Sequence, residues 1–124
     1  MKGLTGDAWP DSLLELRDKV RRFAADRDWD QFHSPKNLSM ALSVEAGELL
    51  EHFQWVSDDA SAELPPEALV KVREELADVL LYLIRIADKL DVDLVDAAQS
   101  KIVVNAEKYP IEKSRGTSKK STDL

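Results

Sequence analysis

The chain has 124 residues, 44% of them hydrophobic, which is enough for one folded domain with a modest core. Its formal net charge of −7 argues against general binding of polymeric nucleic acid. The absence of cysteine excludes disulfides, thiol catalysis and thiolate metal sites, and it agrees with a cytoplasmic location. No apolar run reaches the length of a membrane span, and the N-terminus lacks a signal-peptide pattern.

Apolar periodicity and helix start signals predict four helices and no strand. Residues able to cap a helix, or proline at a first helical position, mark each start. The predicted helices run from Asp11 or Ser12 to about Arg27 or Asp28, from Ser34-Pro35 to about Val56, from Pro65 or Pro66 to about Leu90, and from Asp93 to about Lys108. The third helix is apolar over most of its circumference, which indicates burial in this domain or at a subunit contact.

These elements predict an all-α four-helix bundle. We expect an N-terminal arm over residues 1–10, the helical domain over 11–110, and an irregular basic tail over 111–124. A loop over 28–33 joins the first two helices, and a turn-like stretch over 57–64 joins the second to the third.

Two acidic motifs stand out on the second and third predicted helices. Glu45 and Glu48 are three residues apart, as are Glu75 and Asp78, so each pair shares one helix face. The middle of each pair is about 10 to 11 residues from the turn, or about 16 Å along a helix. An antiparallel hairpin therefore brings all four carboxylates to one level. Gly47, between the first pair, costs a helix about 1 kcal/mol relative to alanine; close approach by a partner helix or a ligand would explain it.

Four converging carboxylates repel one another unless a cation lies between them. An all-oxygen set favours Mg²⁺, with Mn²⁺ also possible, whereas di-iron bundles use Glu-x-x-His motifs that are absent here. Isolated acidic pairs are also common on solvated faces, where Lys and Arg neutralise them. Magnesium commonly bridges carboxylates and substrate phosphates, so the pattern favours a substrate that carries phosphate groups.

Aromatic and polar residues near the acids indicate a nucleotide, with stacking for the base and metal for the phosphates. Trp29 and His33 come from the loop before the second helix. Trp55, seven residues beyond Glu48, is expected on the same helix face, and Tyr82 follows Asp78 by four residues. The same aromatic residues also fit a packed core. Two residues on the fourth helix, Lys101 and Asn105, are placed to reach phosphate or sugar, although a solvated lysine fits almost as well.

At these residues the chain resembles the MazG-like all-α nucleoside triphosphate pyrophosphohydrolases, and within them the dCTP pyrophosphatase branch. The resemblance runs from about Leu14 to the C-terminus. It is carried by Phe23-Ala24-Ala25-Asp26-Arg27-Asp28-Trp29, Gln31-Phe32-His33, Pro35, Asn37-Leu38, Glu45, Gly47-Glu48-Leu49, Phe53-Gln54-Trp55, Glu74-Glu75-Leu76-Ala77-Asp78-Val79-Leu80, Tyr82-Leu83, Ser100-Lys101, Asn105, Tyr109-Pro110, Ser114-Arg115-Gly116 and Thr122-Asp123-Leu124.

The resemblance implies cleavage of a triphosphate between the α and β phosphorus atoms, giving a monophosphate and pyrophosphate. It implies a substrate such as dCTP or a modified dCTP, a role in cleansing the nucleotide pool, and a homotetramer or homodimer whose active sites are completed across subunits. The residues matching the family's Mg²⁺ ligands are Glu45, Glu48, Glu75 and Asp78, and those matching its nucleotide contacts are Trp29, His33, Trp55, Tyr82, Lys101 and Asn105. We expect Glu45 or Glu48 to position the attacking water or take its proton.

Two departures from the branch concern substrate preference rather than the metal site. Val20 stands where the branch can carry a histidine near the nucleotide, and Ala106 stands where a basic residue is usual. A different class of function is also open: a non-catalytic helical module that binds a divalent metal and assembles subunits. Consumption of a triphosphate distinguishes the enzyme from this module.

Overall fold

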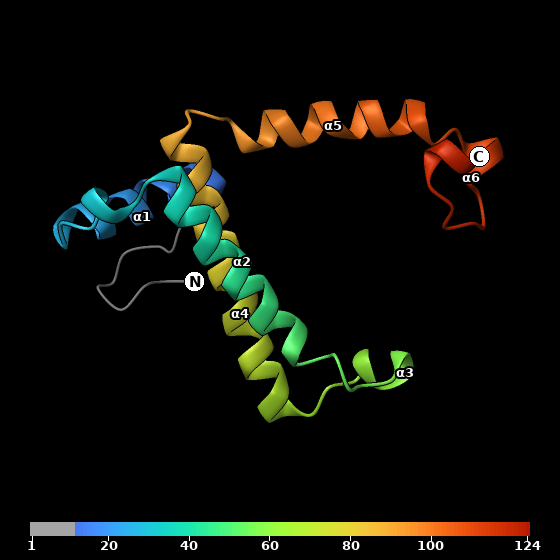
Figure 1. Ribbon diagram of the computed structural model, residues 1–124, viewed down its shortest axis with the longest axis horizontal. Helices are drawn as coiled ribbons and strands as arrows, with labels where there is room; N and C mark the ends of the chain where they lie inside the picture. Colours follow the sequence, from blue (N-terminus) through green and yellow to red (C-terminus); the bar gives the residue numbers. More distant parts are fainter. Residues whose placement is uncertain (1–11) are drawn as a thin grey trace. The chain divides into compact units, whose positions relative to one another are not determined.

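The computed structural model describes residues 12–124; the predicted N-terminal arm lies outside them. Every regular element in that range is helical, as Figure 1 shows, which confirms the all-α prediction. The helices are α1 (Leu13–Asp26), α2 (Pro35–Glu51), α3 (Asp58–Ser61), α4 (Pro66–Lys89), α5 (Leu94–Lys108) and α6 (Ile111–Ser114), with single 3₁₀ turns at Asp30–Phe32 and Ser121–Asp123. Within residues 12–124, no helix has both the length and the apolar character that crossing a membrane requires.

Side-chain caps fix three helix starts where the sequence predicts them. The Ser12 hydroxyl accepts a hydrogen bond from the backbone N–H of Glu15 at 3.2 Å. The Ser34 hydroxyl does the same for Asn37 at 3.1 Å, and Pro35 follows at the first helical position. Asp93 caps the start of α5, because its carboxylate accepts a hydrogen bond from the backbone N–H of Asp96 at 3.0 Å. Each cap satisfies a donor that the helix itself leaves unpaired.

The long helices α2 and α4 form the predicted hairpin. They lie side by side and run in opposite directions (Figure 1), and α1 packs against α4. Apolar side chains from all three helices are buried between them: Ala24, Leu38, Val72, Ile84 and Ala87. This packing sets the register in which the two acidic motifs meet.

Three local predictions are wrong. The helix expected to run to Val56 ends at Glu51, because hydrogen bonds to the carbonyl three residues back replace the helical ladder: the N–H of His52 donates to Leu49 at 3.3 Å, and that of Phe53 donates to Leu50 at 2.8 Å. The stretch expected to be only a turn contains α3, whose start is capped by the Ser57 hydroxyl. The tail expected to be irregular contains α6, which begins after Pro110.

The chain divides into two units after Asp91, and each is described by itself. The first contains α1 to α4, and the second contains α5 and α6. The helices that pack together in the first unit are α1, α2 and α4, so a four-helix bundle and a single domain over 11–110 remain predictions.

Candidate functional site

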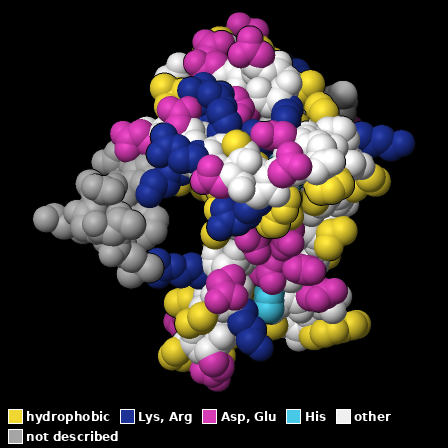
Figure 2. Space-filling view, turned by 90° about the vertical axis from the view of Figure 1, so that its left-hand side faces the viewer, with side chains coloured by type: hydrophobic (Ala, Val, Ile, Leu, Met, Phe, Trp, Pro, Cys, Tyr) yellow, Lys and Arg dark blue, Asp and Glu magenta, His cyan; other side chains and the backbone are white. Residues whose placement is uncertain are grey.

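Three of the four predicted metal ligands meet between α2 and α4. Glu45 and Glu48 on α2 and Glu75 on α4 each offer one carboxylate oxygen, and these oxygens lie within 4.8 Å of one another. All three side chains are half-buried. We call these three residues the glutamate cluster. Figure 2 shows acidic side chains gathered near the middle of one face, beside a histidine.

The electrostatics of the glutamate cluster are unfavourable for carboxylates alone. The Oε2 atoms of Glu45 and Glu75 are buried and have no hydrogen-bond partner. Burial raises the pKa of Glu45 to about 7, with further contributions from Glu75 and from the charges of Glu48 and Asp78. Buried acceptors normally have partners, and an unpaired set of carboxylate oxygens is the donor set that a hard divalent cation takes. The residues present therefore fit Mg²⁺ or Mn²⁺.

The fourth predicted ligand, Asp78, stands slightly apart. It is exposed on α4 and is not among the oxygens within 4.8 Å, although its charge contributes to the raised pKa of Glu45. His52, just after α2, places Nε2 at 3.8 Å from Oε1 of Glu75. Asp78 also lines the neighbouring pocket, so it connects the glutamate cluster to that cavity.

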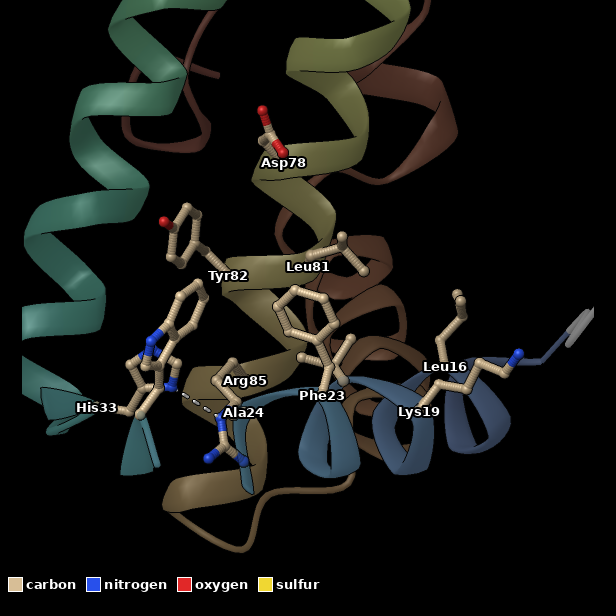
Figure 3. Close-up of a pocket in the computed structure, with 11 residues that line it drawn as sticks. Leu16, Lys19, Phe23, Ala24, His33, Asp78, Leu81, Tyr82 and Arg85 are labelled. Atoms are coloured by element: carbon tan, nitrogen blue, oxygen red, sulfur yellow. Dashed lines mark hydrogen bonds between the residues drawn. The ribbon is translucent and has the colours of Figure 1, made fainter. Parts of the chain in front are cut away.

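The pocket has a volume of about 480 Å³. Figure 3 shows its walls: side chains of α1 on one side, side chains of α4 on another, and His33 from the segment before α2. Asp78 lies at one end of the view, and Arg85 with His33 lies at the other. The lining residues are Leu16, Lys19, Val20, Phe23, Ala24, Trp29, His33, Asp78, Leu81, Tyr82 and Arg85. A mostly apolar cavity with a few polar groups at its ends is typical of a site for a small organic ligand.

Three of the predicted nucleotide contacts, Trp29, His33 and Tyr82, line this pocket. The Trp29 ring packs edge-on against Phe23, with centroids 5.6 Å apart, and lies 6.2 Å from the imidazole of His33. Val20, where the related branch can carry a histidine, is also on the wall. The structure therefore brings these residues together, and their role in binding remains a proposal.

The other three predicted contacts lie elsewhere in the chain. Trp55 follows the end of α2, so the expectation that it continues the helix face of Glu48 is wrong; its side chain is 89% exposed and does not line the pocket. Lys101 and Asn105 are exposed on α5, in the second unit. Their contact with a ligand stays a prediction.

Sequence reasoning missed Arg85, which is only 3% exposed at the end of the pocket. Its guanidinium pairs with Asp30, contacts Asp88 at 3.3 Å, and donates from Nε to Nδ1 of His33 at 3.2 Å. The sequence did contain a sign of it, since Arg85 is the one charged residue in the apolar run 79–87. A charged side chain in such a buried run usually has a partner of opposite charge. The apolar wall residues Leu16, Phe23 and Leu81 gave no signal beyond ordinary core periodicity.

The chain is similar in sequence and in fold to proteins that are already known. Residues 40–124 match the MazG-like family. Mouse dCTP pyrophosphatase 1 is 47% identical over 115 residues, covering 91% of this chain and 68% of the mouse protein. Human dCTP pyrophosphatase 1 is 43% identical with the same coverage. The crystal structure of a pyrophosphatase from Archaeoglobus fulgidus matches with a TM-score of 0.75 and 40% identity, covering 79% of this chain and 92% of that one.

Proposed function

The chain belongs to the MazG-like family, as its sequence predicted, and from this premise we propose that it is a metal-dependent nucleoside triphosphate pyrophosphohydrolase acting on dCTP or a modified dCTP. The products would be the nucleoside monophosphate and pyrophosphate. The dCTP pyrophosphatases at 43 to 47% identity support this reaction and substrate class. A role in cleansing the nucleotide pool follows from the same reaction.

One observation carries the proposal. The glutamate cluster, with two buried oxygens that lack partners, lies beside an apolar pocket whose wall includes Asp78 and Tyr82. The cluster suits a cation that binds phosphates, and the pocket suits a base. Trp29 and Tyr82 offer aromatic surfaces for that base. A nucleotide requires both chemistries next to each other.

The residues that would hold the metal are Glu45, Glu48, Glu75 and Asp78. A bound Mg²⁺ supplies neutralisation of phosphate charge and polarisation of the phosphorus and of a coordinated water. Mn²⁺ takes the same oxygen ligands and would substitute for Mg²⁺.

In the reaction, the oxygen of a water molecule forms a bond to the α-phosphorus while the bond to the α,β-bridging oxygen breaks. Glu45 or Glu48 orients this water and accepts its proton, and pyrophosphate takes the bridging oxygen with its electron pair. The apolar pocket wall formed by Val20, Phe23 and Leu81 excludes water from the base. No covalent enzyme intermediate is needed.

Assembly into a homotetramer or homodimer belongs to the same proposal. Large apolar side chains remain exposed on the long helices of both units, and subunit contacts would cover them. On α4 they include Leu69, Val70, Leu76, Leu80 and Leu83, and on α5 they include Val95, Ile102, Val103 and Val104. Within such an assembly, Trp55, Lys101 and Asn105 would reach the nucleotide of a neighbouring subunit.

The test is a screen of common and 5-modified nucleoside triphosphates with Mg²⁺, in which the products are separated by chromatography. We expect dCTP or a 5-substituted dCTP to give the monophosphate and pyrophosphate in equal amounts. Release of inorganic phosphate instead would contradict cleavage between the α and β phosphorus atoms. If Mg²⁺ raises the melting temperature and no triphosphate is consumed, the chain is the metal-binding assembly module instead.

A further inference from the structure

The buried Arg85 is the centre of a polar network at the end of the pocket away from Asp78. Its guanidinium binds Asp30 and Asp88, and these carboxylates have second partners of their own. Asp30 lies 3.3 Å from Nζ of Lys89, and Asp88 accepts from Nε of Arg21 at 2.9 Å. A guanidinium held on two sides by carboxylates has a fixed plane, so the direction of its Nε–H is fixed too.

The Nε–H of Arg85 determines the state of His33. Nε of Arg85 donates to Nδ1 of His33 at 3.2 Å, and Figure 3 draws this bond. A guanidinium is always a donor, so Nδ1 must carry a lone pair. The imidazole is then neutral, with its proton on Nε2, where it forms no hydrogen bond to any other residue in 12–124. His33 lines the pocket, so this unused donor belongs to the pocket wall.

The charges around the imidazole favour the same state. Burial, followed by the positive charge of Arg85, lowers the pKa of His33 below its ordinary value. Lys89 on α4 acts in the same direction, and Asp30 from the 3₁₀ turn opposes it. The Trp29 ring, 6.2 Å away, restricts how the imidazole can turn.

We propose that Arg85 is a positioning residue that holds His33 as a neutral donor through Nε2–H, so that the pocket selects a base offering a hydrogen-bond acceptor at that place. Cytosine meets this requirement with its O2 or N3 lone pair. The ligand's identity rests on the proposed function, whereas the state of His33 does not.

The direct test is ¹⁵N NMR of the histidine rings in the full-length protein. The chain has two histidines, so the variant His52→Gln assigns the signals. Wild type should show His33 protonated on Nε2 only, and neutral at a pH where a free histidine is half charged. A wild-type spectrum with the proton on Nδ1, or with both nitrogens protonated near pH 6.5, would overturn the proposal.

The variant Arg85→Met removes the donor and keeps the length of an apolar stem. Asp30 keeps Lys89 and Asp88 keeps Arg21, so both carboxylates retain a positive partner. We expect the His33 signals to become a mixture of both tautomers, and the pKa of His33 to move toward its ordinary value. The matched control is Arg73→Met, an exposed position on the same helix, which should leave both unchanged. An Arg85→Met spectrum identical to wild type would refute the role of Arg85.

Kinetics give the second readout. Loss of one oriented neutral hydrogen bond should raise the KM for dCTP roughly threefold to tenfold while kcat changes little. Arg85→Lys, which restores a donor without the planar fork, should recover part of the wild-type KM and tautomer preference. If wild type shows the expected tautomer and hydrolyses no triphosphate, the proposed function fails while the positioning role stands. If KM is unchanged in Arg85→Met despite altered tautomers, selection through His33 is refuted.

Discussion

At the scale of single residues, the most informative group is Glu45, because its carboxyl must lose a proton before a metal can bind. The pKa of this residue is raised to about 7, chiefly by burial. Metal and proton therefore compete for the same oxygens. We expect the Mg²⁺ dissociation constant, measured by calorimetry, to rise by up to about tenfold per pH unit as the pH falls below 7. A dissociation constant that is flat from pH 8 to pH 5.5 would contradict this competition.

The same raised pKa predicts how the metal-free protein responds to pH. A carboxyl whose pKa is higher in the folded state than in the unfolded chain stabilises the fold below the unfolded pKa, and that contribution is lost as the pH rises through the folded value. The window here runs from about pH 4.5 to about pH 7. With a chelator present, we expect Glu45→Gln to raise the melting temperature at pH 8. In a separate measurement with Mg²⁺, the same variant should lack the rise that Mg²⁺ causes in wild type. If Glu45→Gln melts at a lower temperature than wild type in chelator at pH 8, the ionised Glu45 carboxylate does not destabilise the fold.

Glu48 tests the catalytic role proposed for the glutamate cluster. Glu48→Ala should lower kcat by about a hundredfold or more, because it removes a carboxylate that would contact both metal and water. The helix content by circular dichroism should not change. Glu51→Ala, one turn further along α2 and exposed, is the control expected to keep normal turnover. Normal pyrophosphate release by purified Glu48→Ala would refute the assignment.

At the scale of elements, Gly47 has a simpler role than its sequence position indicated. A Cβ at this position would meet no atom within 4 Å, so the expected close approach is not found among residues 12–124. Gly47→Ala should stabilise α2 by about 0.5 to 1 kcal/mol in urea unfolding, and the reverse change Ala46→Gly should destabilise it by a similar amount. Destabilisation by Gly47→Ala would indicate that a neighbouring subunit or a ligand occupies the space.

Packing of α2 against α4 should dominate the stability of the hairpin. Leu38 is 2% exposed, whereas Leu50 on the same helix is 61% exposed. Leu38→Ala should cost about 2 to 5 kcal/mol, since it leaves a cavity in the core, and Leu50→Ala should cost less than about 1 kcal/mol. Equal losses from the two substitutions would contradict the register described for α2.

Helix starts were predictable from the sequence and helix ends less so. The side chains of Ser12, Ser34 and Asp93 each accept a hydrogen bond from the backbone N–H of the third residue after them, which is a purely local interaction. The end of α2 at Glu51 was missed because neither glycine nor proline interrupts residues 48–57, and helical periodicity continues to Trp55. Turn hydrogen bonds from His52 to the Leu49 carbonyl and from Phe53 to the Leu50 carbonyl end the helix without any marker in the sequence.

At the scale of the whole molecule, residues that act through distant partners were the hardest to foresee. The three glutamates were predictable because a hairpin of known length brings them level. Arg85 was not, since its partners Asp30 and His33 are 55 and 52 residues away, and only the packing of α4 brings them together. The apolar pocket wall depends in the same way on α1 packing against α4.

Assembly is a property that the whole molecule should show in solution. The exposed apolar side chains of α4 and α5 are costly in water unless a partner covers them. Light scattering after size exclusion should give a mass of about two or four times the 14.0 kDa of one chain, as expected for a dimer or tetramer. A monomer at micromolar concentration would contradict both the assembly and the placement of Trp55 at a neighbouring site.

The most direct test of a metal-dependent reaction at the glutamate cluster compares two adjacent glutamates on α4. Glu75 belongs to the glutamate cluster, whereas Glu74 is exposed and outside it. With dCTP and Mg²⁺, pyrophosphate release by Glu74→Gln should equal that of wild type, and release by Glu75→Gln should be at least about a hundredfold slower. Equal rates for Glu75→Gln and wild type would contradict a metal-dependent reaction at this cluster.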